Sequence, residues 1–237
     1  MGVPAPGYAE HGLVWSREGH QVVPLIEHDI EAALPSLDVL ICINPNNPTG
    51  RLTARDTLLR WHGELAARGG WLVVDEAFLD ASAGDSLVPF CRLPGLMVLR
   101  SLGKFYGLAG VRAGLMVGPQ DSCAAMESRL GPWELSHPAR FIMAAALQDS
   151  DWQQQQRQRL QQARQALDQR LRAAGFEVSG NCDLFAYVQH RDAVKIQEGL
   201  ARQGVLVRLF REPLAIRFAV PAGESDLHRL AQALAAV

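Results

Sequence analysis

Five short apolar runs constrain the fold of the first two thirds of this chain. The runs span residues 20–25, 38–44, 71–78, 96–101 and 113–118. Most of them are nearly continuous apolar stretches, which is the pattern of parallel strands covered on both faces of a sheet. A helix is expected between residues 53 and 68, with Thr53 as its N-cap and Gly69 and Gly70 as its end. The pattern predicts an α/β domain whose active residues gather just beyond the carboxyl ends of the strands.

The last third of the chain has a different pattern. Residues 151–174 are rich in Gln and Arg, with Leu160, Leu167 and Leu171 at helical spacing, which predicts a long amphipathic helix. Strands are expected at 176–178, 184–189, 205–210 and 215–220, and helices near 192–202 and 224–236. The sequence therefore predicts a large domain over residues 1–148, with a mostly parallel sheet flanked by helices. A linker helix and a smaller α+β domain follow over residues 149–237.

Composition and charge exclude several classes of function. The formal net charge is -2 over 237 residues, so electrostatics give no reason to expect a nucleic acid or an anionic membrane as partner. No apolar run approaches the ~20 residues that span a bilayer, and the N-terminus lacks the pattern of a signal peptide. The cysteines are scattered and the histidines show no metal spacing. We therefore expect a cytoplasmic protein without disulfides and without a metal site.

Four motifs follow the predicted strands in order. They are NPNNPTG at 44–50, DEAF at 75–78, SLGK at 101–104 with Arg112 after it, and Arg217 inside the strand AIRFAV. Each has an ordinary structural interpretation, as a turn, a helix cap or a basic side chain that reaches solvent. Taken one by one, however, these interpretations do not explain why all four motifs occur together in this order along the predicted strands.

The order and spacing of these motifs resemble the fold-type I pyridoxal-phosphate (PLP) enzymes, the aspartate aminotransferase superfamily of class I and II. The resemblance runs over essentially the whole chain, and it implies that fold and PLP as the cofactor. It also implies that Lys104 is the catalytic residue, bonded to the cofactor as a Schiff base, and that Asp75 faces the pyridine nitrogen. The other positions it implies are Asn47 at the phenolic oxygen and near the substrate, Ser101 and Arg112 at the phosphate, Tyr8 stacked on the ring, and Arg217 at the substrate carboxylate.

The chemistry of these side chains suits the implied roles. A Schiff-base lysine has to be deprotonated to attack, and burial beside other cations favours the neutral amine. Glycines beside Lys104 let a planar cofactor approach the backbone. Arg112 and Arg217 each offer a planar fork to a phosphate or a carboxylate. We therefore expect Lys104 and Arg112 to lie in a segment that is otherwise buried.

Two features depart from the family pattern. Phe78 stands where many members carry a tyrosine that also bonds the phenolic oxygen. Family members have more sequence before the Tyr8 region, carrying an N-terminal arm and a glycine/serine turn that binds phosphate. We expect the chain to be N-terminally truncated relative to the family, either as a fragment or through a start assigned too far downstream.

Two stretches indicate the branch of the family. RSLGKFYGLAGVRAG (100–114) is similar to histidinol-phosphate aminotransferases and threonine-phosphate decarboxylases, and LGPWELSHPA (130–139) resembles the decarboxylases of cobalamin biosynthesis. That resemblance implies conversion of L-threonine O-3-phosphate to (R)-1-amino-2-propanol O-2-phosphate. It also implies a small phosphorylated amino acid as substrate and a homodimer. A histidinol-phosphate or other class I/II aminotransferase is the alternative. An inactive truncated fragment or interaction module is an alternative of another class.

Overall fold

A computed structural model describes residues 1–82 and 84–236 of the chain. Contacts divide the chain into two units. Unit 1 comprises Met1–Asn47 and Leu52–Asp149, and unit 2 comprises Pro48–Arg51 and Ser150–Val237. None of the described helices is both long and apolar enough to cross a membrane.

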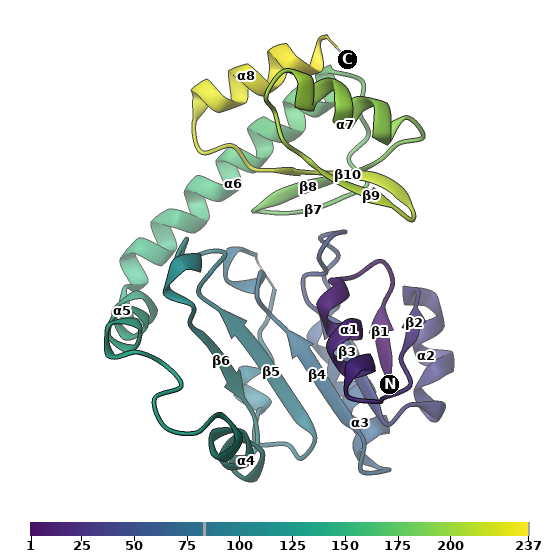
Figure 1. Cartoon of the computed structure of the whole chain (residues 1–237), viewed down its shortest axis with the longest axis vertical. Helices are drawn as coiled ribbons and strands as arrows, with labels where there is room; N and C mark the ends of the chain where they lie inside the picture. Colours follow the sequence, from purple (N-terminus) through teal and green to yellow (C-terminus); the bar gives the residue numbers. More distant parts are fainter. Residues whose placement is uncertain (83, 237) are drawn as a thin grey trace. The chain divides into compact units, whose positions relative to one another are not determined.

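Unit 1 is built on a six-stranded sheet in the order β2-β1-β3-β4-β5-β6 (Figure 1). The strands are β1 (Gly2–Pro4), β2 (Val23–Leu25), β3 (Val39–Ile43), β4 (Trp71–Asp75), β5 (Leu96–Ser101) and β6 (Gly114–Val117). All neighbouring strands pair in parallel except β5 and β6, which are antiparallel. The α/β fold class expected from the sequence, with a mostly parallel sheet, is confirmed.

Helices cover both faces of this sheet because side chains alternate along each strand. Val74 packs with Leu58 in the larger apolar cluster, on the side of α3. Val73 points to the opposite face, where Trp15 of α1 packs. The helices of unit 1 are α1 (Ala9–Arg17), α2 (Ile30–Ala33), α3 (Arg55–Ala66), α4 (Gln120–Leu130) and α5 (His137–Gln148), with short 3-10 turns at Glu27–Asp29, Leu34–Ser36, Leu79–Ala81, Val88–Phe90 and Ala109–Val111.

Several elements of unit 1 differ from the sequence expectation. The strand expected at 20–25 is limited to β2, and β1 lies between β2 and β3 although no strand was expected there. A strand of three residues is too short to show the alternation that predicts one. Helices α1, α2, α4 and α5 were also not expected. Two of these four, α1 and α4, contain no buried residue.

The start of α3 shows how tertiary contacts override a local signal. Thr53 was expected as the N-cap, but Ala54 occupies that position without a side-chain cap. The side chain of Asn44 binds the backbone of Thr53 instead: Asn44 Oδ1 accepts from the Thr53 N–H at 2.7 Å, and Asn44 Nδ2 donates to the Thr53 carbonyl at 3.2 Å. Because Asn44 is buried, this pairing fixes Thr53 outside the helix.

Unit 2 has an antiparallel four-stranded sheet in the order β7-β8-β10-β9. Its strands are β7 (Gly180–Cys182), β8 (Phe185–Gln189), β9 (Arg208–Arg211) and β10 (Leu214–Ala219), and its helices are α6 (Ser150–Ala173), α7 (Ala193–Arg202) and α8 (Glu224–Leu234). Ile216 and Phe218 of β10 belong to the core that also holds residues of all three helices. The helices lie on one side of the sheet (Figure 1).

The strand expected at 176–178 is wrong. The Phe176 N–H donates to the Leu171 carbonyl at 2.9 Å, so this residue closes the end of α6 rather than joining the sheet. Its ring is buried and contacts Phe218 at 6.4 Å between centroids. The apolar character that suggested a strand therefore serves the core, and the first strand of unit 2 is β7.

Candidate active site

The carboxyl ends of β3, β4 and β5 meet at one edge of the unit 1 sheet. In the ladder Ile43 pairs with Asp75, and Asp75 pairs with Leu99. The Asn44 N–H then donates to the Asp75 carbonyl at 2.8 Å, and the Glu76 N–H donates to the Leu99 carbonyl at 2.9 Å. The segments 44–47, 75–78 and 101–104 therefore start side by side, as the parallel pattern predicted.

Asp75 is held by a histidine that the sequence analysis did not assign to the site. His11 Nε2 lies 2.8 Å from Asp75 Oδ2, and both side chains are largely buried. The other carboxylate oxygen accepts from the Ala77 N–H at 2.9 Å. His11 lies on α1, a helix that was not expected, and no local pattern marks it. The one available signal is its position one helical turn after Tyr8.

Tyr8 and Asn47 lie near the same edge. Tyr8 occupies the N-cap position of α1, is half exposed, and meets the His11 ring edge-on with centroids 5.8 Å apart. The neighbouring Asn46 donates from Nδ2 to the Pro6 carbonyl at 3.0 Å, which ties the NPNNPTG motif to the turn that precedes Tyr8. Asn47 itself is half-buried.

Lys104 is itself exposed, within a segment whose apolar neighbours are buried as expected. Its Nζ lies 5.6 Å from the centre of the buried Phe78 ring. The apolar residues that suggested burial, Leu102 and Phe105, fill the interior themselves. Lys104 stands between them on a turn, and its neighbour Gly103 has no side chain to cover it. Phe78 therefore provides an aromatic face to the lysine where many family members have a hydroxyl.

The residues expected at the phosphate lie at the last position of β5 and on the turn that precedes β6. Ser101 Oγ accepts from the Gly103 N–H at 3.1 Å and so shapes the turn that carries Lys104. Arg112 adopts the left-handed conformation with φ 55 and is exposed. Around Gly107 and Gly110 nothing lies within 4 Å of an added Cβ, so the backbone of this turn is open to a ligand.

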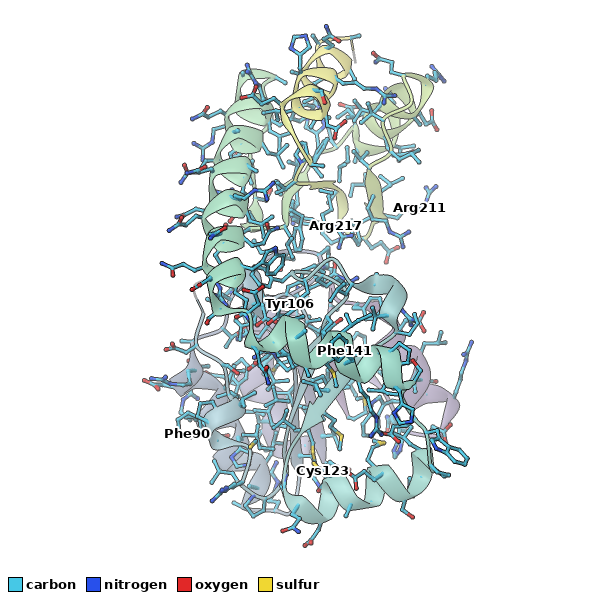
Figure 2. All side chains as sticks on the ribbon, turned by 90° about the vertical axis from the view of Figure 1, so that its left-hand side faces the viewer. Phe90, Tyr106, Cys123, Phe141, Arg211 and Arg217 are labelled. Carbon is cyan, nitrogen blue, oxygen red and sulfur yellow. The ribbon has the colours of Figure 1, made fainter. Side chains whose placement is uncertain are left out.

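Arg217 lies in unit 2, at the centre of β10, where it is half-buried (labelled in Figure 2). Its neighbours in register are Tyr187 on β8 and Arg208 on β9. Its guanidinium lies 5.0 Å from the centre of the Phe185 ring. Desolvation lowers the pKa of Arg217, and the charge of Arg208 adds to this effect.

Arg208, the neighbour of Arg217 on β9, is exposed. Its position opposite Arg217 places it on the face that α6, α7 and α8 do not cover. We call this side of the sheet the arginine face; its residues are the buried Phe185 and Tyr187 and the two cations Arg208 and Arg217. Two guanidinium groups on adjacent strands can bind two anionic groups or one divalent anion.

Polar side chains that include a lysine lie at the carboxyl edge of a mostly parallel sheet, which is where α/β folds of this class bind their ligands. Among the described residues there is no group of three or more His, Cys, Asp or Glu side chains that could hold a metal ion. Residues 2–234 match the family model of class I and II aminotransferases. The chain therefore belongs to this family of PLP-dependent enzymes.

Two curated relatives illustrate the range of this similarity. The chain is 44% identical to the threonine-phosphate decarboxylase of Pseudomonas aeruginosa over 99% of its own length and 71% of that protein. It is 32% identical to the histidinol-phosphate aminotransferase of Gluconacetobacter diazotrophicus over 82% of its own length and 56% of that protein.

A solved structure shows the same fold. The histidinol-phosphate aminotransferase of Sinorhizobium meliloti, solved in complex with pyridoxal-5'-phosphate, superposes with a TM-score of 0.88. The match covers 99% of this chain and 68% of the solved chain at 22% identity. At that identity the likeness concerns the fold.

Proposed function

We propose that the chain is a PLP-dependent decarboxylase that converts L-threonine O-3-phosphate to (R)-1-amino-2-propanol O-2-phosphate in cobalamin biosynthesis. The observation that carries this proposal is the pair Arg208 and Arg217 on adjacent strands of one face. Threonine phosphate offers a carboxylate and a phosphate to this pair, whereas histidinol phosphate has no carboxylate. The higher identity to a threonine-phosphate decarboxylase supports the same choice.

The side chains of unit 1 fit PLP by their chemistry. A primary amine for the aldehyde comes from Lys104, and a carboxylate for a protonated ring nitrogen comes from Asp75, which His11 holds in place. Cationic and hydroxyl groups suited to a phosphate come from Arg112 and Ser101. Asn47 would serve the phenolic oxygen and the substrate, and Tyr8 the face of the ring. When bound, the cofactor supplies an electron-accepting ring for the electrons of the broken Cα bond.

The residues of the chain then have distinct tasks in the reaction. Arg217 binds the substrate carboxylate and fixes the direction of the bond between this group and Cα, and its partial desolvation strengthens that hydrogen-bonded pair. The Cα–carboxylate bond breaks, carbon dioxide leaves, and the Lys104 ammonium delivers the proton that replaces it at Cα. In a transamination Lys104 would remove a proton from Cα instead.

A histidinol-phosphate aminotransferase is the second candidate, because of the 32% identity to such an enzyme. The test is to incubate the purified chain with PLP and each substrate, and to assay released carbon dioxide and 2-oxoglutarate-dependent glutamate formation separately. Carbon dioxide from threonine phosphate supports the proposal. Glutamate without carbon dioxide moves the assignment to the aminotransferase. A chain that folds but develops no absorbance with PLP would favour the alternative of an inactive fragment or an interaction module.

The proposal extends to organisation and partners. Residues 1–148 would form the cofactor domain, and residues 149–237 the linker helix and small domain. A small phosphorylated amino acid would be the substrate, and the enzyme would act as a cytoplasmic homodimer. Size-exclusion chromatography with light scattering tests the dimer.

A further inference from the structure

Glu76, directly after Asp75, is a fully buried carboxylate with no role in the chemistry above. Its side chain has no exposed surface. It accepts three hydrogen bonds: from Ser86 Oγ at 2.6 Å, from the Leu87 N–H at 2.7 Å and from Arg100 Nη1 at 3.0 Å. Each of its oxygens is therefore bound by neighbouring segments of unit 1.

Arg100 joins this carboxylate to a second one. Its other terminal nitrogen, Nη2, pairs with Asp80, whose side chain is 8% exposed, while that of Arg100 is 20% exposed. Burying ions is costly, and a buried ion pair is often no more stabilising than apolar residues of the same size. Two buried carboxylates around one arginine therefore call for an explanation other than stability alone.

The cluster connects the two segments that carry the proposed site. Glu76 and Asp80 stand on either side of Phe78 in the sequence, and Arg100 directly precedes Ser101. Through these contacts the end of β4 and the end of β5 are joined by side chains as well as by the strand ladder. Phe78, between the two carboxylates, faces Lys104 Nζ.

We infer that the buried cluster of Glu76, Asp80, Ser86 and Arg100 is a positioning device that holds Phe78 against Lys104 and keeps Asp75 at a fixed place at the strand edge. These residues act through Phe78 and the strand ends and do not touch the reacting groups. The inference deepens the proposed function and rests on its assignment of Lys104.

The test measures the reactivity of Lys104 in the full chain without added cofactor. The chain has two lysines, Lys104 and Lys195, and Lys195 on α7 is 85% exposed, so it serves as an internal reference. At one fixed pH an amine-acylating reagent is applied and both sites are followed by peptide mass spectrometry. The contact of Lys104 Nζ with the Phe78 ring slows the reaction of this amine with the reagent. We expect its displacement in Glu76→Gln to raise the Lys104/Lys195 labelling ratio by about two- to five-fold, the range of an exposed cation–π contact.

Two comparisons make the result specific. Phe78→Leu removes the ring directly and should give the same rise, and Glu76→Gln added to it should give no further rise. The matched control is Arg60→Gln on α3, which breaks an exposed ion pair with Glu31 and should leave the ratio unchanged. Ser86→Ala is the second variant if Glu76→Gln fails to fold, with a rise in the same direction expected.

A second readout separates positioning from plain stability. Amide hydrogen exchange should increase at residues 76–80 and at 101–104 together in Glu76→Gln, at a temperature where the variant is folded. If Glu76→Gln lowers the unfolding temperature but leaves both the labelling ratio and the exchange at 101–104 unchanged, the cluster is only structural and the inference is wrong.

The inference and the proposed function can fail separately. A wild-type chain that binds no PLP while the variants still raise Lys104 labelling would overturn the proposed function and leave the positioning role standing. If the wild-type chain decarboxylates threonine phosphate but no cluster variant changes the labelling ratio, the positioning role is overturned and the proposed function stands.

Discussion

The strand edge of unit 1 and the arginine face of unit 2 place their cations in different ways. Lys104 and Arg112 are exposed and stand on turns, where backbone contacts such as Gly103 N–H to Ser101 Oγ set their position. Arg217 stands in the middle of a strand, where pairing with Tyr187 and Arg208 fixes its place and desolvation lowers its pKa. Substitutions at the turns should therefore remove chemistry and leave the fold intact, whereas substitutions at the arginine face should change binding and stability together.

The largest effect is expected at Lys104. Lys104→Ala should abolish the visible, borohydride-reducible absorbance of the PLP-loaded chain, because Lys195 is the one other lysine and lies on a surface helix. The unfolding temperature should stay unchanged, since the Lys104 side chain is exposed. A chromophore that persists in Lys104→Ala would mean that Lys195 or the N-terminal amine binds the cofactor, and the assignment of the SLGK motif would fail.

The next effect is expected on the arginine face. Arg217→Gln should lower kcat/KM for threonine phosphate by about 100-fold, because a charged, two-pronged hydrogen bond to the carboxylate is lost. Arg211→Gln is the matched control: this arginine lies one strand away, is exposed, and is three positions from Arg208 along β9. Equal losses in both variants would indicate general electrostatic attraction instead of a specific contact.

A smaller effect is expected at His11. His11→Asn should weaken PLP binding by about ten-fold, because the Asp75 carboxylate loses a hydrogen bond that holds it in place. Absorbance titration with PLP measures the change. The control is His28→Asn, which alters an exposed histidine 3.5 Å from Asp29; this variant should bind PLP as the wild type does. Unchanged affinity in His11→Asn would show that the strand end alone positions Asp75.

The smallest effect is expected at Arg208 and concerns stability. Like charges directly opposite each other on neighbouring strands destabilise a sheet, and Arg208 lies opposite Arg217. Arg208→Gln should therefore raise the free energy of unfolding by about 0.2–1 kcal/mol, measured by urea denaturation, while it weakens binding of the substrate. A variant that is less stable than the wild type would mean that the cation–π contact of Arg208 with Phe210 outweighs the repulsion.

Much of the fold was predictable from local patterns. The apolar runs of β3, β4 and β5 are continuous because both faces of these strands are covered, and their carboxyl ends share one edge because the strands are parallel. These two facts were enough to place the DEAF and SLGK motifs together. The long helix α6 was equally clear, since its apolar positions recur at helical spacing.

Other features depended on contacts between distant residues. The pairing of His11 with Asp75 joins positions 64 residues apart, and the strand β1 has too few residues to show a pattern. The sequence by itself determined the class of fold and the order of the motifs along the strand edge, because burial on both faces imposes a continuous apolar run. Only the tertiary structure decided that Lys104 is exposed and Glu76 buried, because a charged side chain becomes buried only where other segments supply its hydrogen-bond partners.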